Sequence, residues 1–282
     1  MQDLRFALRQ LLKNPGFTAV AVLTLALGIG ATTAMFSLIH GVLLKPLPFP
    51  ESDRLVALFE NHREQGQDLV NLTAPGFTDW RAQSTVFEDL AAYQPGGFDL
   101  TGTGDPARLS GIRASASLFP LLRAQPALGR GFSPEEDVFG NGRVAVLGHR
   151  LWQERFQGAS DVLGKGVTLD GNSYTIVGVM SEGFRFAGLD ADVWLPMAFE
   201  AWELENRGGH NYQAIGRLKP GVSLAAARAE MEGIAGRLSQ QYEPSRGWSV
   251  TMLPLQEQMV RGSERPLYLL FGAVGFVLLI AC

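Results

Sequence analysis

The sequence predicts a membrane-anchored α+β protein with an N-terminal transmembrane helix, a two-lobed mixed α/β domain outside the cytoplasm, and the start of a second transmembrane helix. Two observations predict this class. Of the 282 residues, 46% are hydrophobic and only 18% are charged, and the apolar surplus is concentrated at the two ends of the chain. Between these ends, short β-branched runs alternate with helical patterns, which is typical of a mixed α/β domain.

The composition excludes several classes of protein. With 24 basic against 28 acidic residues the net charge is −4, so a basic nucleic-acid binder is excluded and we expect no nucleic-acid partner. The apolar content excludes a disordered chain. Cys282 is the single cysteine, so the chain can form neither an internal disulfide nor a cysteine metal cluster.

Residues 1–16 are predicted to form an amphipathic helix on the cytoplasmic face of the membrane. At helical spacing, leucines fall on one side and a row of cations lies beside them, before Asn14-Pro15-Gly16 ends the helix. Burying the leucines away from water stabilises membrane binding, and each cation near an anionic leaflet contributes about 1 kcal/mol of favourable binding free energy. An ordinary cationic flank of a transmembrane helix remains the alternative. The predicted membrane-interface residues are Leu4, Arg5, Leu8, Arg9, Leu11 and Lys13.

Residues 17–44 are predicted to contain the first transmembrane helix. The run 17–39 has no ionisable side chain, and as a helix it would span about 35 Å, enough to cross a bilayer. A secretory signal peptide is the alternative, but its apolar region is usually about 7–15 residues long. Because cations are in excess before the run, we expect a cytoplasmic N-terminus. About 220 residues then lie on the other side of the membrane.

A stripe of small residues follows one side of this helix. Ala26, Gly30 and Ala34 are spaced four apart, and small side chains let helix backbones approach closely in lipid. We therefore predict that these three residues pack against a partner helix. A lipid-facing composition without a partner is the alternative.

Residues 266–282 are predicted to be the beginning of a second transmembrane helix. The stretch opens at Pro266, and residues 267–282 are all uncharged. Because about 20 apolar residues are needed to cross a bilayer, we expect this stretch to be the first three quarters of a span. The alternative is a short apolar tail buried in a core.

The middle of the chain, 45–265, is predicted to be one mixed α/β domain. Its order of elements favours a two-lobed domain in which about 133–207 is inserted into the outer part. Gly171-Asn172 predicts a β-hairpin, and Ser223 is the expected N-cap of the best-supported helix. We expect strands at 55–60, 108–115, 143–147, 166–169, 173–180, 193–195, 212–218 and 248–253, and helices at 75–82, 86–92, 118–123, 150–157 and 223–242.

The chain lacks the motifs of common catalytic sites. The four histidines lie far apart, and none is three or four residues from another histidine or from a cysteine, so metal binding is not expected. Neither a Gly-x-Ser-x-Gly nor a Ser-x-x-Lys motif is present. We therefore expect no catalytic, cofactor-binding or metal-binding residue, and we expect that the protein is not an enzyme.

The opening of the chain resembles that of a known class of membrane protein. LRQLLKNPGFTAVAVLTLALGIGATTA at 8–34 and VLLKPLPFP at 42–50 resemble the start of bacterial ABC transporter permeases of the MacB-like and FtsX-like class. The most similar branch is the acidobacterial-type orphan permeases, which carry no ATPase in the same chain. Further matching motifs are FTDW at 77–80, GRGF at 129–132, VAVLG at 144–148, DGNSYTIVGVM at 170–180, GRLKPGVS at 216–223 and LFGAVGFVLLIAC at 270–282.

The resemblance implies a MacB-like periplasmic core domain at 45–265, held in the bacterial inner membrane. It also implies a second permease copy and a separate ABC ATPase as partners, besides the lipid bilayer, and it allows partners in the periplasm. The expected function is that of the N-terminal part of a permease subunit, which couples the ATPase to movement of the periplasmic domain for efflux or export. Macrolides, peptides, lipids and lipoproteins all remain open as substrates.

Two other functions remain as alternatives. A membrane-anchored periplasmic sensor or ligand-binding protein would carry a cytoplasmic output domain after the second span, whereas a permease would carry two further apolar stretches. A secreted globular enzyme would show a mature N-terminus beyond the first apolar run.

Overall fold

The computed structural model describes residues 13–39, 46–102, 104–261 and 264–281. The chain divides into two compact units, one formed by 1–46 with 260–282 and the other by 47–259. Of the predicted amphipathic helix, only Lys13 and the three residues after it are described, and Lys13 is exposed. The other predicted membrane-interface residues lie outside the described residues, namely Leu4, Arg5, Leu8, Arg9 and Leu11.

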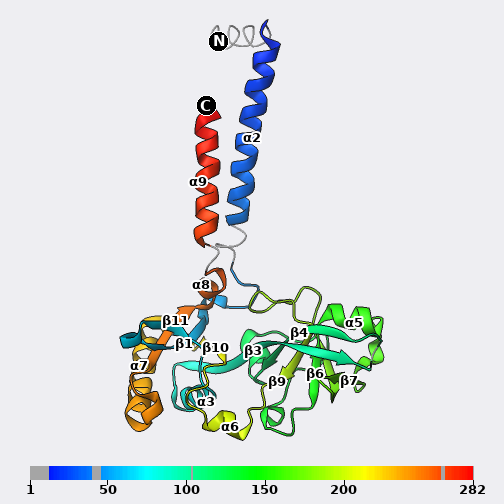
Figure 1. Cartoon of the computed structure of the whole chain (residues 1–282), viewed down its shortest axis with the longest axis vertical. Helices are drawn as coiled ribbons and strands as arrows, with labels where there is room; N and C mark the ends of the chain where they lie inside the picture. Colours follow the sequence, from blue (N-terminus) through cyan, green and yellow to red (C-terminus); the bar gives the residue numbers. More distant parts are fainter. Residues whose placement is uncertain (1–12, 40–45, 103, 262–263, 282) are drawn as a thin grey trace. The chain divides into compact units, whose positions relative to one another are not determined.

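The first unit contains two apolar helices that lie side by side, α2 (Pro15–Ile39) and α9 (Glu264–Ala281) (Figure 1). Within the described part of the chain, one stretch is long and apolar enough to cross a membrane, Thr18–Ser37 in α2, with a mean hydropathy of 2.0. Large apolar side chains project from it, and Leu27 is 73% exposed. Such a surface requires lipid or protein around it. The assignment of 266–282 as the start of a second span stays a prediction.

The second unit is built on one mixed sheet (Figure 1). The strand order is β11-β1-β10-β3-β4-β9-β6-β8-β5, with β2 paired to β1 and with β7 paired to β3 and β8. The β4–β9 and β6–β8 pairs are parallel, and the other pairs are antiparallel. The strands are β1 (Leu55–His62), β2 (Gln67–Val70), β3 (Phe87–Thr101), β4 (Ala107–Ala114), β5 (Leu128–Gly129), β6 (Val144–Leu147), β7 (Gly166–Leu169), β8 (Asn172–Val179), β9 (Val193–Pro196), β10 (Gln213–Leu218) and β11 (Ser249–Pro254).

Six α-helices of this unit are described, α3 (Ala74–Gln83), α4 (Leu118–Leu122), α5 (His149–Phe156), α6 (Ala201–Glu205), α7 (Leu224–Gln241) and α8 (Leu255–Val260). Four predicted helices are confirmed as α3, α4, α5 and α7. The Ser223 hydroxyl accepts a hydrogen bond from the Ala226 N–H at 3.2 Å, as expected of an N-cap. The predicted hairpin joins β7 to β8, but its turn residues are Asp170 and Gly171, one position earlier than the predicted Gly171-Asn172. Both turn residues have positive φ, as in a type I′ turn.

The helix predicted at 86–92 is wrong, because these residues belong to the fifteen-residue strand β3. Residues 87–93 pair with β10, and residues 93–100 pair with β4. Local apolar spacing suits a helix here, but pairing with distant strands on both edges decides the conformation. Strands β2 and β5 and helices α6 and α8 are not among the predicted elements either.

Strand β3 carries Pro95-Gly96-Gly97 near its middle. Proline lacks an N–H group and is tolerated in a sheet only where its N–H side faces no partner strand. Pro95 pairs with Ile112 of β4, while the other edge of β3 at this point lies between the stretches bonded to β10 and to β7. This position explains how a proline and two glycines fit within a long strand.

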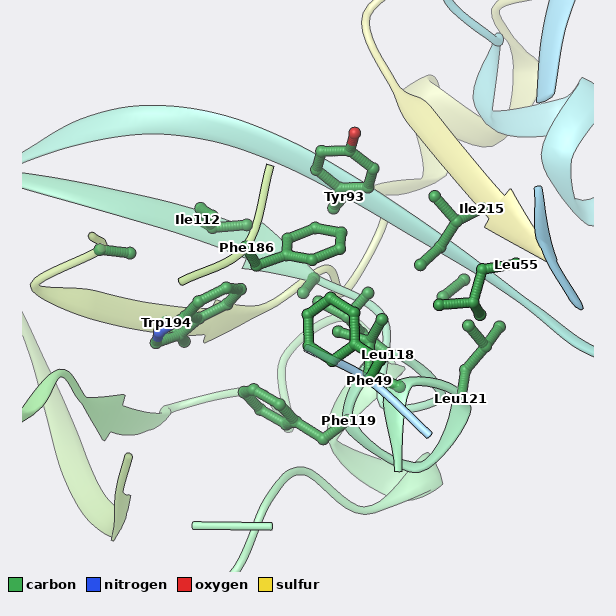
Figure 2. Packing of buried hydrophobic residues seen from close by; sticks show 14 of the residues in the cluster. Phe49, Leu55, Tyr93, Ile112, Leu118, Phe119, Leu121, Phe186, Trp194 and Ile215 are labelled. Atoms are coloured by element: carbon green, nitrogen blue, oxygen red, sulfur yellow. The ribbon is translucent and has the colours of Figure 1, made fainter. Parts of the chain in front are cut away.

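Three hydrophobic clusters fill the unit. One, under α3 and α7, belongs to the half of the sheet that holds β1, β10 and β11, which we call lobe 1. A second, beside α5, belongs to the half that holds β6 to β9, which we call lobe 2. A central cluster takes side chains from both lobes, including Ile215 of β10 and Trp194 of β9 (Figure 2). Its aromatic rings make edge contacts, with the Phe119 and Trp194 centroids 5.4 Å apart.

The predicted bounds of the inserted lobe, about 133–207, stay a prediction. Lobe 2 also takes buried side chains from before these bounds, such as Leu100 of β3 and Leu109 of β4. The single sheet therefore runs from one lobe into the other without a break.

Replacing Trp194 by alanine tests the central cluster. Trp194 is 1% exposed, and we expect Trp194→Ala to lower the free energy of unfolding by about 3–5 kcal/mol, because it leaves a large cavity. The matched control is Trp202→Ala, since Trp202 is 57% exposed and its loss should cost less than about 1 kcal/mol. Urea unfolding of both variants measures the difference, and equal losses would contradict the assigned packing.

Candidate functional site

Both ends of the folded domain join the central cluster. At the incoming end, Leu47 packs against the cluster and Phe49 belongs to it. At the outgoing end, Leu255 is 2% exposed within the same cluster, and Met259 packs on it. A displacement of either connecting segment would therefore act on one set of packed side chains shared by the two lobes.

An arginine–glutamate network holds the incoming segment. The Glu51 carboxylate pairs with Arg54 and, at 2.8 Å, with Arg123, and Arg54 also pairs with Glu88 at the start of β3. Arg54 Nε donates to the Leu218 carbonyl at 2.8 Å. Desolvation opposes ionisation of Glu51, but the hydrogen bonds and charges of the two arginines lower its pKa overall. The network ties the incoming segment to β3, β10 and the end of α4.

Arg217 of β10 anchors the same segment from beneath and is 1% exposed. Its Nε donates to the Leu121 carbonyl at 2.7 Å, and its Nη1 donates to the Glu51 carbonyl at 3.0 Å. Burial lowers the pKa of Arg217, and the charge of Arg123 lowers it further. A buried cation held mainly by carbonyl groups rather than by a close carboxylate is a positioning element.

Sequence reasoning missed this network. Arg217 lies in the motif GRLKPGVS, which carries the family resemblance. The one available signal was a charged residue inside a predicted buried strand at 212–218. Its partners lie 96 and 166 positions away in the chain, so sequence spacing could not identify them.

An apolar groove of about 610 Å³ lies between α3, α6 and the segment after residue 136. Phe77, Phe199 and Met197 line it, and Phe139 stands at its rim with 61% of its surface exposed. Asp137 also lines the groove, and burial raises its pKa to about 6. Groups of exposed apolar residues beside a groove are a common feature of interaction surfaces.

The predicted helix-packing residues Ala26, Gly30 and Ala34 are all exposed on α2. An added Cβ at Gly30 would meet no atom within 4 Å. The least exposed described positions of α2 include Gly28 and Thr32, which lie on the opposite side of the helix by their spacing. The prediction that the stripe packs against a partner therefore remains open.

The described residues contain no group of three or more His, Cys, Asp or Glu side chains that could hold a metal ion. The predicted absence of catalytic and cofactor-binding residues remains a prediction.

Comparisons with solved structures give the same fold at low sequence identity. A domain of a permease protein from Porphyromonas gingivalis matches with a TM-score of 0.58 and 18% identity, covering 73% of this chain and 92% of that one. The periplasmic region of MacB from Actinobacillus actinomycetemcomitans matches with a TM-score of 0.54 and 13% identity, covering 82% and 98%. The extracellular domain of the ABC-type transporter YknZ from Gram-positive bacteria matches with a TM-score of 0.51 and 14% identity, covering 70% and 99%. No curated protein matches the chain significantly.

The mixed sheet has the fold of the periplasmic region of MacB, and in the sequence it follows an apolar helix that is long enough to cross a membrane. The MacB-like periplasmic core domain family matches residues 18–234, and the chain belongs to this family. The resemblance read from the opening motifs is thereby confirmed at the level of the family. Membership supports a role as a transporter permease.

Replacing Arg217 by methionine tests the anchoring of the incoming segment. Methionine leaves the Leu121 and Glu51 carbonyls without their donor, so we expect a loss of about 1–3 kcal/mol in the free energy of unfolding. We also expect faster amide hydrogen exchange around residues 51–55. The control is Arg246→Met, because Arg246 is 77% exposed in its ion pair and its loss should cost less than about 0.5 kcal/mol. Unchanged exchange at 51–55 would show that Arg217 does not hold this segment.

Proposed function

We propose that the chain is the N-terminal part of an ABC transporter permease subunit, in which a partner ATPase moves the periplasmic domain for efflux or export. The observation that carries this proposal is the family match over residues 18–234. The shared central cluster supports it, because both connecting segments pack into it. A pull on either segment would reach the two lobes through these packed side chains.

We further propose that the chain acts mechanically and is not itself an enzyme. The protein would lie in the bacterial inner membrane with its N-terminus in the cytoplasm. A second permease copy and partners in the periplasm would complete the assembly. The cation excess before the apolar run supports this orientation. The substrate class stays open between small molecules, peptides and lipids.

Affinity purification from native membranes tests the permease function. We expect the full chain to capture an ABC nucleotide-binding subunit, identified by mass spectrometry, and to raise or lower its ATPase rate when both are placed in lipid nanodiscs. Capture of a signalling output protein instead, with no nucleotide-binding subunit, would contradict the permease function. That result would favour the membrane-anchored sensor as the alternative.

Replacing Gly30 by leucine tests the packing stripe on α2. Leucine would hold a facing backbone apart, so we expect several-fold weaker crosslinking between permease copies in membranes. The matched control is Ile29→Leu, which changes the neighbouring exposed position without changing its size. If Gly30→Leu associates as the unchanged chain does, the stripe is not a helix interface.

A further inference from the structure

The chain returns from α6 to β10 through a short segment, residues 206–212, that we call the strap. It crosses the surface of lobe 1, where it contacts α3, α6 and β1 and residues of the neighbouring loops. Arg207, His210 and Tyr212 each bind a different partner, and Gly208 and Gly209 lie between the first two. The strap is thus held at three side chains, with a flexible glycine pair between two of them.

Arg207 makes the first anchor. Its Nη2 lies 2.7 Å from Asp79 Oδ2 of α3, and its guanidinium carbon lies 3.5 Å from the centre of the Tyr242 ring. An ion pair and a cation–π contact therefore both hold the Arg207 side chain.

Tyr212 makes the third anchor at the start of β10. Its backbone forms a bridge with Leu72, in which the Leu72 N–H donates to the Tyr212 carbonyl at 2.6 Å. Its hydroxyl donates to the buried carboxylate of Glu203. Burial, followed by this hydrogen bond, raises the pKa of Tyr212, so the anchor is unchanged near neutral pH.

His210 makes the central anchor, and its imidazole is a titratable group. Its Nδ1 lies 2.7 Å from Glu60 Oε2 and 3.0 Å from the Asn71 carbonyl. Its ring stacks on Trp248 with centroids 4.2 Å apart and 30° between the planes. Glu60 is only 7% exposed, so its carboxylate depends on His210 for a cationic partner.

The surroundings of His210 contain few other charges. On β1, the carboxylate of Glu60 faces it directly, and the His62 ring makes an edge contact with Trp248, with centroids 5.4 Å apart. From α3 and the strap, Asp79 and Arg207 are already paired with each other. The ring of Tyr242, at the end of α7, is in cation–π contact with the guanidinium of Arg207.

We propose that His210 is a pH-dependent latch for the strap. When protonated, it holds the strap on Glu60 and Trp248. When neutral, it leaves Glu60 buried without a cationic partner, and the strap detaches between Arg207 and Tyr212. This latch is a property of the fold and does not depend on the proposed transport function.

The direction of the pH effect follows from the contacts. The hydrogen bond to Glu60 raises the pKa of His210 above its usual 6.5, burial opposes the shift, and the charge of Glu60 adds to it. A raised pKa in the folded state means that the stabilisation is fully present below about 6.5 and is lost as the pH rises through the raised value. The latch is therefore closed below the ordinary pKa of histidine and opens as the pH rises through the raised pKa of His210.

Hydrogen exchange of the full chain in lipid nanodiscs tests the latch. After correction for intrinsic exchange, we expect the amides of 206–212 and 245–249 to lose about tenfold or more in protection between about pH 5.5 and about pH 9. Amides of α5 should show no such change. A wild-type strap with constant protection over this range would overturn the proposal.

Two variants identify the titrating group. His210→Gln should abolish the pH dependence of strap protection. The matched control His149→Gln should keep it, because His149 also lies against a tryptophan, Trp152 at 5.4 Å, but on α5. A strap that keeps its wild-type pH profile in His210→Gln would overturn the proposal.

A further variant decides the matter if His210→Gln does not fold. Glu60→Gln keeps the shape of the side chain but removes the buried charge that His210 neutralises, so strap protection should lose most of its pH dependence. A wild-type pH profile of strap protection in Glu60→Gln would assign the pH dependence to another group and overturn the latch.

Discussion

Strand β3 is the constraint on which the architecture depends. It is hydrogen-bonded to β10 along its first half and to β4 along its second half, so one backbone belongs to both lobes. The lobes cannot separate without breaking this ladder, and their relative motion is limited to bending or twisting of the sheet. Pro95-Gly96-Gly97 lies just where β3 passes from one partner to the other, and a strand with these residues resists bending less than a β-branched one.

The central cluster determines how a force on the connecting segments would be distributed. Phe49 and Leu255 come from opposite ends of the domain, yet they belong to the same packed group as Trp194 of lobe 2. Close-packed interiors transmit displacement because they are nearly incompressible. The network around Glu51 and Arg217 determines which elements a displacement of the incoming segment would reach first, since it ties this segment to β10 and to α4.

The sequence predicts the parts of this fold that local signals determine. Helix α7 follows from its apolar stripe and its Ser223 cap, and the β7–β8 hairpin follows from a glycine turn. The apolar length of α2 predicts a membrane span in the same way. Residues 86–92 have equally good local helical spacing, but their partners on β10 lie more than 120 positions later, and those partners determine the conformation.

The candidate sites are long-range features, which explains why local patterns missed them. In the sequence, Arg217 is a single charged residue in a predicted strand. Its role is visible only in the fold, where its guanidinium binds the carbonyl of Glu51, 166 positions away in the chain. His210 likewise reads as an isolated histidine, because Glu60 and Trp248 come from different strands and loops.

The strap and β3 are held by different kinds of interaction. β3 is held by backbone hydrogen bonds, which do not respond to pH near neutrality, whereas the middle of the strap depends on one histidine–carboxylate pair. Opening the latch would therefore loosen the connection between α6 and β10 on the surface of lobe 1, while the sheet stays intact. A device of this kind would change the mobility of one segment of lobe 1, and not whether the domain is folded.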